Sequence, residues 1–329
     1  MQILRILALT ICLSMIGTHQ AHTNGMGIVT GSDKGTYYQI GLNLAALLEQ
    51  FNPSLSLNVL TSNGSLDNIA DVFDRPGVQM GIVQSDALTF IRTLAKNNPN
   101  LSRIADKVRV VFPLYNEEIH IVANSNVRVF SDLDKKKVAI GQAGSGSFLT
   151  SRLLFEITGI EPQMVLNGGQ EALNMLLSGE VDAMIYVAGY PVQLLKEVPA
   201  GRGIHIVPIE DKSVMEYYYT STIPALTYPW QTTAVTTAAV KAAIVSYDYR
   251  QLQCSNVGML AKTVYEHLDW LKAHGHPKWQ QVDLDFTMKN WEQYQCVKNV
   301  IHPEPPGPIQ DKDGSTRDTL RDILNSMGR

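Results

Sequence analysis

The pattern of apolar and polar positions repeats one unit twice along the chain, at residues 26–83 and 137–187. Each copy contains an apolar strand, a glycine-rich loop, an amphipathic helix, a second strand, an Asn-Gly junction, a second helix and a third strand. In the first long helix, apolar side chains recur at helical spacing at Tyr37, Ile40, Leu44, Leu47, Leu48 and Phe51. Alternating strands and helices predict an α/β protein with mostly parallel sheets flanked by helices.

Two such units predict two similar lobes joined by crossing strands. Residues 114–124 are expected to cross from the first lobe to the second, and residues 235–245 to return. We therefore expect residues 23–122 and 236–302 to form the first lobe and residues 123–235 the second, with a ligand between them. A Pro-rich segment and an amphipathic C-terminal helix are expected at residues 303–329.

The first 22 residues have the pattern of a secretory signal peptide. Arg5 precedes an apolar stretch at 6–16, and small or polar residues follow as far as Ala21, near which we expect cleavage. The stretch is shorter than the roughly 20 apolar residues of a membrane span. The alternative is a buried N-terminal strand or helix. A signal peptide would place the mature protein in the periplasm.

The composition limits the class of protein to which this chain can belong. The chain has 329 residues, 45% hydrophobic and 18% charged, with a net charge of −4. These values are those of a globular protein, and without a stripe of Lys and Arg we expect no nucleic-acid partner. We expect a monomer. After loss of Cys12, an exported chain would keep Cys254 and Cys296, which are either disulfide-bonded or two separate buried thiols.

The glycine-rich loops are the candidate binding elements, because the first N–H groups of a helix lack partners within the helix and attract anions. The strongest candidate is 144–147, Gly-Ser-Gly-Ser, whose alternative role is a helix cap without a ligand. Tyr37 fits the apolar helix face, so Tyr38 is the better candidate for a ligand contact. Tyr190 follows a strand in the second lobe. Residues 84–86 follow a strand at the edge where ligands bind in an open parallel sheet, and Asp86 is expected to cap the next helix instead.

Catalytic patterns are missing from the sequence. Residues 143–146 lack the glycine that a nucleophile elbow needs, and neither a phosphate loop nor a dinucleotide fingerprint occurs. His274 and His276 have no partners at zinc spacing, which favours a solvated loop over a metal site. We expect a protein that is not an enzyme and that needs no cofactor or metal.

Several ordered motifs resemble the TAXI-subfamily solute-binding proteins of tripartite ATP-independent periplasmic (TRAP) transporters. The matching stretches are GTYYQIG (35–41), NGS (63–65), GIVQSDA (81–87), EEIHIV (117–122), GSGS (144–147), VDAMIYVAGYP (181–191) and STIPALTYPWQ (221–231). The resemblance covers roughly residues 27–305. It implies a type II periplasmic-binding-protein fold that closes on its ligand by a hinge.

The resemblance also implies a function. The expected ligand is a small carboxylate, such as glutamate, glutamine or a dicarboxylate, delivered to ion-gradient-driven TRAP permease subunits. The implied ligand-facing residues are Tyr38, Ser65, Gln84, Ser145, Ser147 and Tyr190. Lys34 and Thr36 are further candidates, and Lys34 departs from the family pattern in a way that suits a second carboxylate. The alternative function is that of a ligand-binding receptor that signals to a membrane sensor kinase or chemoreceptor.

Overall fold

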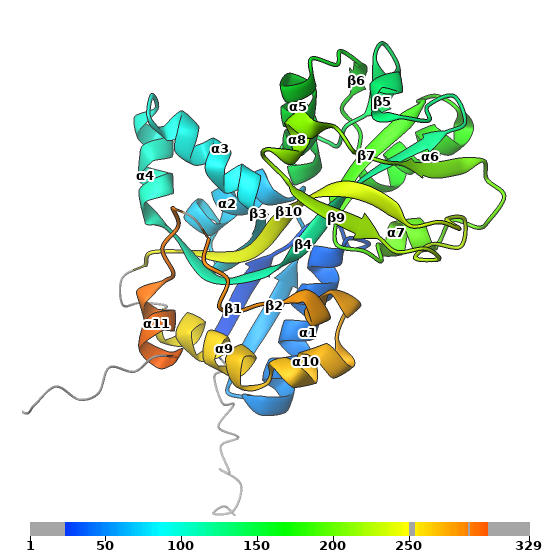
Figure 1. The fold of residues 1–329 in the computed structure, drawn as a ribbon. Coiled ribbons are helices and arrows are strands. Elements are labelled where there is room, and N and C mark those ends of the chain that lie inside the picture. The colour runs from blue at the N-terminus through cyan, green and yellow to red at the C-terminus, as the bar shows by residue number, and fades with distance from the viewer. Residues whose placement is uncertain (1–23, 250–253, 289, 302–329) are drawn as a thin grey trace, which may run out of the picture.

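Two lobes share one ten-stranded sheet (Figure 1). The computed structural model describes residues 24–249, 254–288 and 290–301. The expected signal peptide and the expected C-terminal helix lie outside the described residues. Within the described ranges, no helix has the length and apolar character needed to cross a membrane.

The two repeated units fold alike. The first contains β1 (Asn24–Val29), α1 (Thr36–Phe51), β2 (Leu55–Leu60), α2 (Ser65–Asp74) and β3 (Met80–Gln84). The second contains β5 (Lys137–Ala139), α5 (Gly146–Thr158), β6 (Gln163–Val165), α6 (Gly169–Ser178) and β7 (Ala183–Ala188). In each unit the first strand lies in the middle, parallel to the other two. The predicted repeat of parallel units is confirmed.

Two long antiparallel strands, β4 (Val108–Asn124) and β10 (Val235–Tyr247), connect the units. Eight of the ten strands lie in the order β2-β1-β3-β10-β4-β7-β5-β6, and the other two, β8 (Ile204–Val207) and β9 (Tyr219–Ile223), pair with β4 and β10, respectively. The ladder between β4 and β10 is irregular near the pairing of Pro113 with Ala243, where proline has no N–H to donate. The expected lobe borders fall within these strands, and the division of the chain at those borders stays a prediction.

The other elements cover the sheet or extend it. They are α3 (Ser85–Ala95), α4 (Pro99–Lys107), η1 (Phe130–Leu133), α7 (Gln193–Lys196), β8 (Ile204–Val207), α8 (Lys212–Met215), β9 (Tyr219–Ile223), α9 (Cys254–Glu266), α10 (Leu268–His274), η2 (Pro277–Gln281) and α11 (Gln295–Ile301). Cys254 of α9 and Cys296 of α11 form a disulfide, with their Cα atoms 5.2 Å apart.

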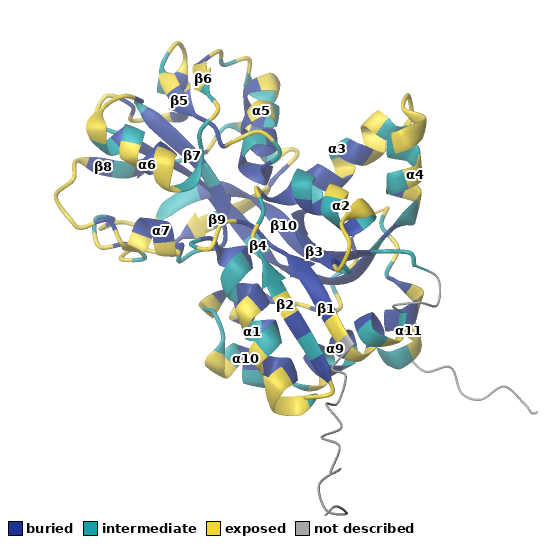
Figure 2. Ribbon diagram, turned by 180° about the vertical axis from the view of Figure 1, so that it is seen from behind, coloured by how far each residue is buried: buried dark blue, intermediate teal, exposed yellow. Residues whose placement is uncertain are grey.

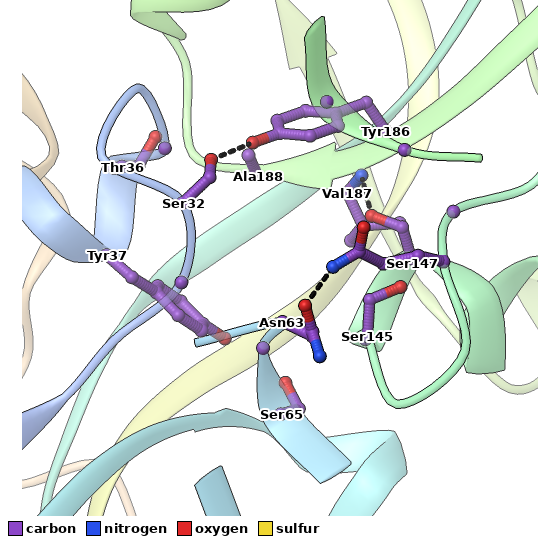
Figure 3. A pocket seen from close by; sticks show the side chains of 18 of the residues that line it. Ser32, Thr36, Tyr37, Asn63, Ser65, Ser145, Ser147, Tyr186, Val187 and Ala188 are labelled. Atoms are coloured by element: carbon purple, nitrogen blue, oxygen red, sulfur yellow. Dashed lines mark hydrogen bonds between the residues drawn. The ribbon is translucent and has the colours of Figure 1, made fainter. Parts of the chain in front are cut away.

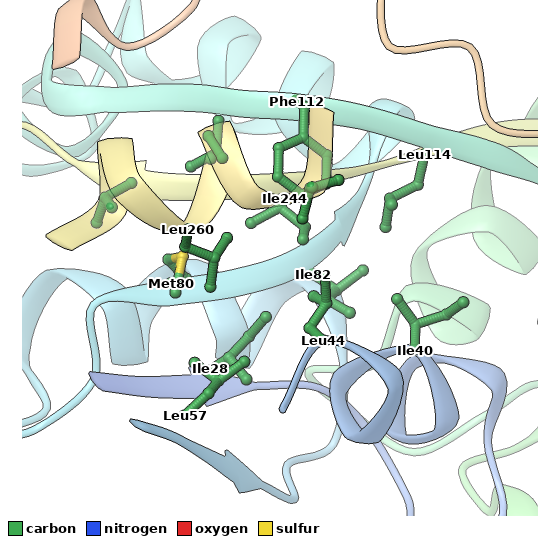
Figure 4. Close-up of a cluster of buried hydrophobic side chains, with 14 of the residues drawn as sticks. Ile28, Ile40, Leu44, Leu57, Met80, Ile82, Phe112, Leu114, Ile244 and Leu260 are labelled. Carbon is green, nitrogen blue, oxygen red and sulfur yellow. The ribbon is translucent and has the colours of Figure 1, made fainter. Parts of the chain in front are cut away.

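Each lobe has its core where helices pack on the sheet. Figure 2 shows that the strands are mostly buried, whereas many helices expose one side. In the first lobe, Ile28, Leu44, Met80 and Leu260 belong to one buried cluster between the sheet, α1 and α9 (Figure 4). All five residues of β3 are buried, as expected for a strand covered by helices on both faces.

A buried ion pair anchors the C-terminal part of the chain to the crossing strand. The ammonium group of Lys278, in η2, lies 2.8 Å from the carboxylate of Glu118, and both side chains are at most 1% exposed. The ring of Tyr190 covers the ammonium at 3.9 Å, and Ser221 donates a hydrogen bond to Glu118. Burial raises the pKa of Glu118 and lowers that of Lys278, while their mutual attraction opposes both shifts.

We expect Lys278→Met to lower the free energy of unfolding by about 3–5 kcal/mol at neutral pH, because it leaves the Glu118 carboxylate buried without its cation. Denaturant unfolding measures the loss. The control is Lys262→Met, which breaks an exposed pair with Glu266 and is expected to cost under about 0.5 kcal/mol. Adding Glu118→Gln to Lys278→Met should restore part of the stability. Similar small losses in both single variants would contradict this account.

Candidate ligand-binding site

A cavity of about 220 Å³ lies between the lobes, where four helices begin. The residues that precede α1, α2, α5 and α6 are Gly35, Gly64, Ser145 and Gly168, and all four line the cavity. Each of these helices follows a strand of a parallel unit, so their N-termini gather at the carboxyl ends of the strands. The cavity therefore faces the positive ends of four helix dipoles.

The helix N-termini do not all remain open to a ligand. The carbonyl oxygen of Gly144 accepts the backbone N–H groups of Leu66 (3.1 Å) and Asp67 (3.3 Å), at the start of α2. These bonds connect the lobes. The glycines before α1 and α6 have no side chain that could cap those helices. The first N–H groups of α1 and α6 are thus better placed to meet an anion than those of α2.

Three serine hydroxyls in the cavity wall are oriented by backbone hydrogen bonds (Figure 3). Ser65 accepts the N–H of Gln84 at 3.0 Å, Ser145 that of Phe148 at 3.1 Å, and Ser147 that of Val187 at 2.9 Å. An oxygen that accepts such a bond still has its own proton to donate. The three hydroxyls can therefore act as hydrogen-bond donors toward an acceptor in the cavity.

One acidic side chain also lines the cavity. Glu117, on β4, is 2% exposed, and its carboxylate accepts a hydrogen bond of 2.7 Å from the hydroxyl of Tyr37. Burial raises the pKa of Glu117 to about 8, the charges of Asp86 and Glu118 add to the rise, and hydrogen bonds from Tyr37 and Gln84 oppose it. This carboxyl group can pair with a cation once it has lost its proton.

No lysine, arginine or histidine is among the described residues that line the cavity. Lys34 lies outside the lining, where its ammonium group contacts Glu197 at 2.6 Å and Gln170 at 3.3 Å, both in the second lobe. Lys34 therefore bridges the lobes. A ligand in the cavity would meet hydroxyls, backbone N–H groups and one carboxyl, but no basic side chain.

Two glycines allow the lobes to approach closely. Gly144 has a φ of 88°, which favours glycine, and a Cβ atom there would meet the carboxylate of Asp67. A Cβ atom on Gly146 would meet the side chains of Gln84 and Ser65 in the first lobe. The Gly-Ser-Gly-Ser loop thus combines oriented hydroxyls with a backbone that tolerates contact across the cleft.

The cavity brings together five of the eight candidates for ligand contact. Ser65, Gln84, Ser145, Ser147 and Thr36 line it. Of these, Thr36 already donates a hydrogen bond to the carbonyl of Gly189 in the other lobe, at 2.5 Å. The remaining three, Tyr38, Tyr190 and Lys34, do not line it.

The structure places Tyr38 and Tyr190 outside the lining of the cavity. Tyr37, which the helical pattern assigned to the core, lies in the cavity wall in place of Tyr38, because its ring packs in the core while its hydroxyl reaches Glu117. Tyr190 packs against Lys278 and accepts a hydrogen bond from Gln281. Its position after β7 brought it beside the buried ion pair.

Sequence reasoning missed Glu117 as a site residue. The signal was present, since Glu117 and Glu118 are adjacent acids inside a segment expected to cross between the lobes. Successive side chains of a strand point to opposite faces. One of the two acids therefore had to face away from the other, and Glu117 is the one that lines the cavity.

Comparisons with known proteins agree with this architecture. The structure of the periplasmic binding protein BugD matches with a TM-score of 0.51 and 14% identity, over 78% of this chain and 84% of that chain. The alkanesulfonate-binding protein SsuA of Xanthomonas axonopodis pv. citri, bound to MOPS, matches with a TM-score of 0.45 and 13% identity, over 92% of each chain. The fold is that of the type II periplasmic binding proteins, as the sequence predicted.

The sequence comparison assigns a family. Residues 28–291, which include both crossing strands and both repeated units except the first residues of β1, match the NMT1-like family. All five cavity-lining candidates lie inside the matched range, and Glu117 does as well. The chain belongs to the NMT1-like family.

Proposed function

We propose that the protein is an exported receptor that closes its two lobes around a small carboxylate bearing an amino group. The observation that carries the proposal is the composition of the cavity wall: three oriented serine hydroxyls and helix N-termini that suit a carboxylate, together with the Glu117 carboxyl, which suits an ammonium group. The volume of about 220 Å³ suits a metabolite smaller than the drug-sized ligands that occupy roughly 300–1,000 Å³.

The composition of the cavity wall also constrains the part of the ligand beyond its carboxylate and amino groups. A second carboxylate would be desolvated without a basic partner in the lining, which is unfavourable. We therefore favour an uncharged side chain, as in glutamine, over a dicarboxylate. Delivery to a TAXI-type TRAP transporter in the periplasm is part of the proposal and is supported by the motif resemblance. The disulfide between Cys254 and Cys296 is consistent with an oxidising compartment.

A matched ligand panel tests the proposal. The protein is unfolded, freed of bound solutes, refolded with its disulfide intact, and titrated calorimetrically with pairs that differ only in the α-amino group: L-glutamine and glutaramate, L-glutamate and glutarate, L-norvaline and pentanoate. We expect the amino member of each pair to bind at least about tenfold more tightly, because it adds a charge-assisted contact of about 1.5–3 kcal/mol. L-Glutamine should bind more tightly than L-glutamate. Failure of all six to bind would overturn the proposed function.

The serine hydroxyls should contribute to affinity without being needed for folding. In Ser145→Ala/Ser147→Ala, each lost hydroxyl removes a hydrogen bond to a charged group, worth about 1.5–3 kcal/mol. Affinity for L-glutamine should therefore fall at least about a hundredfold by calorimetry. The matched control is Ser102→Ala/Ser178→Ala, far from the cavity, which should bind as the parent does. Equal affinities for the two double variants would contradict this placement of the carboxylate.

Affinity should also depend on pH through Glu117. Its pKa of about 8 means that the empty site holds a proton at pH 6–7, and an ammonium ligand must displace it. Affinity for L-glutamine should thus rise by about tenfold from pH 6 to pH 7 and level off near pH 8. Glu117→Gln should weaken binding and flatten this profile, whereas Glu156→Gln, on the exposed side of α5, should leave it unchanged. Affinity that falls with rising pH would instead mean that Glu117 donates its proton to the ligand.

A further inference from the structure

A second cavity, of about 450 Å³, lies between the lobes and is lined by residues of both α3 and α5. We call it the side groove. One wall is formed by Phe90 and its neighbours on α3. Figure 1 shows that α3 belongs to the first lobe. The opposite wall comes from the second lobe, with Leu153 and Ile157 on α5 and the segment 217–219 before and at the start of β9. Ala239 and Val240 of the crossing strand β10 also line it.

The side groove exposes aromatic surface to solvent. Tyr217 is 73% exposed and Tyr219 is 49% exposed, and both line the groove together with Phe90. Aromatic and aliphatic side chains gathered around a concave surface are typical of ligand sites. The groove is larger than the ligand cavity described above and could hold an apolar group of the size of a phenyl ring.

One acidic group lines the side groove. Asp86, in the first turn of α3, accepts hydrogen bonds from Thr150 (2.6 Å) and from its neighbour Ala87 (2.8 Å), and the hydroxyl of Tyr218 lies at 3.5 Å. The N-cap position of α3 is held by Gln84, whose side chain makes no cap hydrogen bond, so Asp86 lies in the first turn of the helix and not at the cap position expected for it. Burial raises the pKa of Asp86 to about 6, which leaves it ionised at pH 7.5. No basic residue is among the described residues that line the groove.

We propose that the side groove is a second ligand site, which takes an apolar amine: an aromatic or alkyl body with one protonated amino group. The body would contact Phe90, Leu153 and the tyrosines, and the ammonium group would meet the Asp86 carboxylate and the aromatic faces, which attract cations. An anion would be repelled by Asp86, and a neutral apolar molecule would leave this charge without a partner.

Occupancy of the side groove favours the closed arrangement of the lobes. Its two walls belong to different lobes, so a ligand makes both sets of contacts only when the lobes are together. Asp86 and Thr150 already join the lobes at this point, and Thr150 also lies 3.4 Å from Gln84, which lines the ligand cavity. Binding in the groove and binding in the cavity are therefore coupled through one equilibrium, and the coupling acts equally in both directions.

Three probes of similar size test the proposal in the full chain: 2-phenylethylamine, 2-phenylethanol and 3-phenylpropanoate, titrated at pH 7.5 by ligand-observed NMR. We expect the amine to bind at least about tenfold more tightly than the alcohol, and the carboxylate to bind most weakly. In Asp86→Asn, the ratio of amine to alcohol affinity should fall to about threefold or less. Because the ratio is taken within one variant, a general loosening of the groove affects both probes alike.

A blocking variant locates the site. Thr89→Trp fills the groove from an exposed position on α3 and should weaken binding of the amine at least tenfold, whereas Thr232→Trp, on an exposed loop elsewhere, should not. Because Thr89 lines the groove and not the ligand cavity, the Thr89→Trp variant separates the two sites. Solution scattering should show a smaller radius of gyration with the amine bound. The proposal is overturned if none of the probes binds at about 10 mM, if Thr89→Trp binds the amine as the parent does, or if Asp86→Asn keeps the full preference for the amine.

Discussion

The antiparallel passage of β4 and β10 through both lobes is the constraint on which the rest of the structure depends. Because both lobes hydrogen-bond to these strands, the side chains at the crossing are fixed with respect to each lobe at once. Glu117 and Glu118 occupy adjacent positions there, and the strand sends them to different surroundings. Glu117 meets the ligand cavity, while Glu118 holds Lys278 and with it the segment that returns to the first lobe.

The carboxyl groups near the crossing are the basis for proposing a cation site in both interlobe cavities. The carboxyl groups of Asp86 and Glu118 both lie close enough to Glu117 to raise its pKa electrostatically. Lys278 contacts Glu118, and among the described residues no basic side chain lines either cavity. Desolvation then favours the protonated forms of Asp86 and Glu117, and a bound ammonium group would relieve that cost. In both proposed sites, the ligand supplies the positive charge that the lining residues lack.

Local patterns were enough to predict the repeated units, the crossing strands and the glycine loops, because each depends on residues close together in the sequence. They were not enough for the contacts that complete the site. Tyr37 reaches Glu117 across 80 positions, and Lys278 reaches Glu118 across 160. A helical face pattern shows which side of a tyrosine ring is buried, but not that its hydroxyl emerges in a cavity. The position of Tyr190 beside Lys278 likewise depends on a C-terminal segment that no local pattern connects to β7.

The four helix N-termini differ in what their first N–H groups bind, and this difference follows from the same geometry. If all four were free, the cavity would offer more backbone donors than one carboxylate can accept. The two α2 N–H groups instead bond to the Gly144 carbonyl, which can approach them because residues 144 and 146 lack side chains. Closure is thus stabilised by protein donors, and in the proposed site the serines of the same loop remain for the ligand. A single sequence, Gly-Ser-Gly-Ser, serves both purposes, since its glycines bring the lobes together at the point where its serines line the cavity.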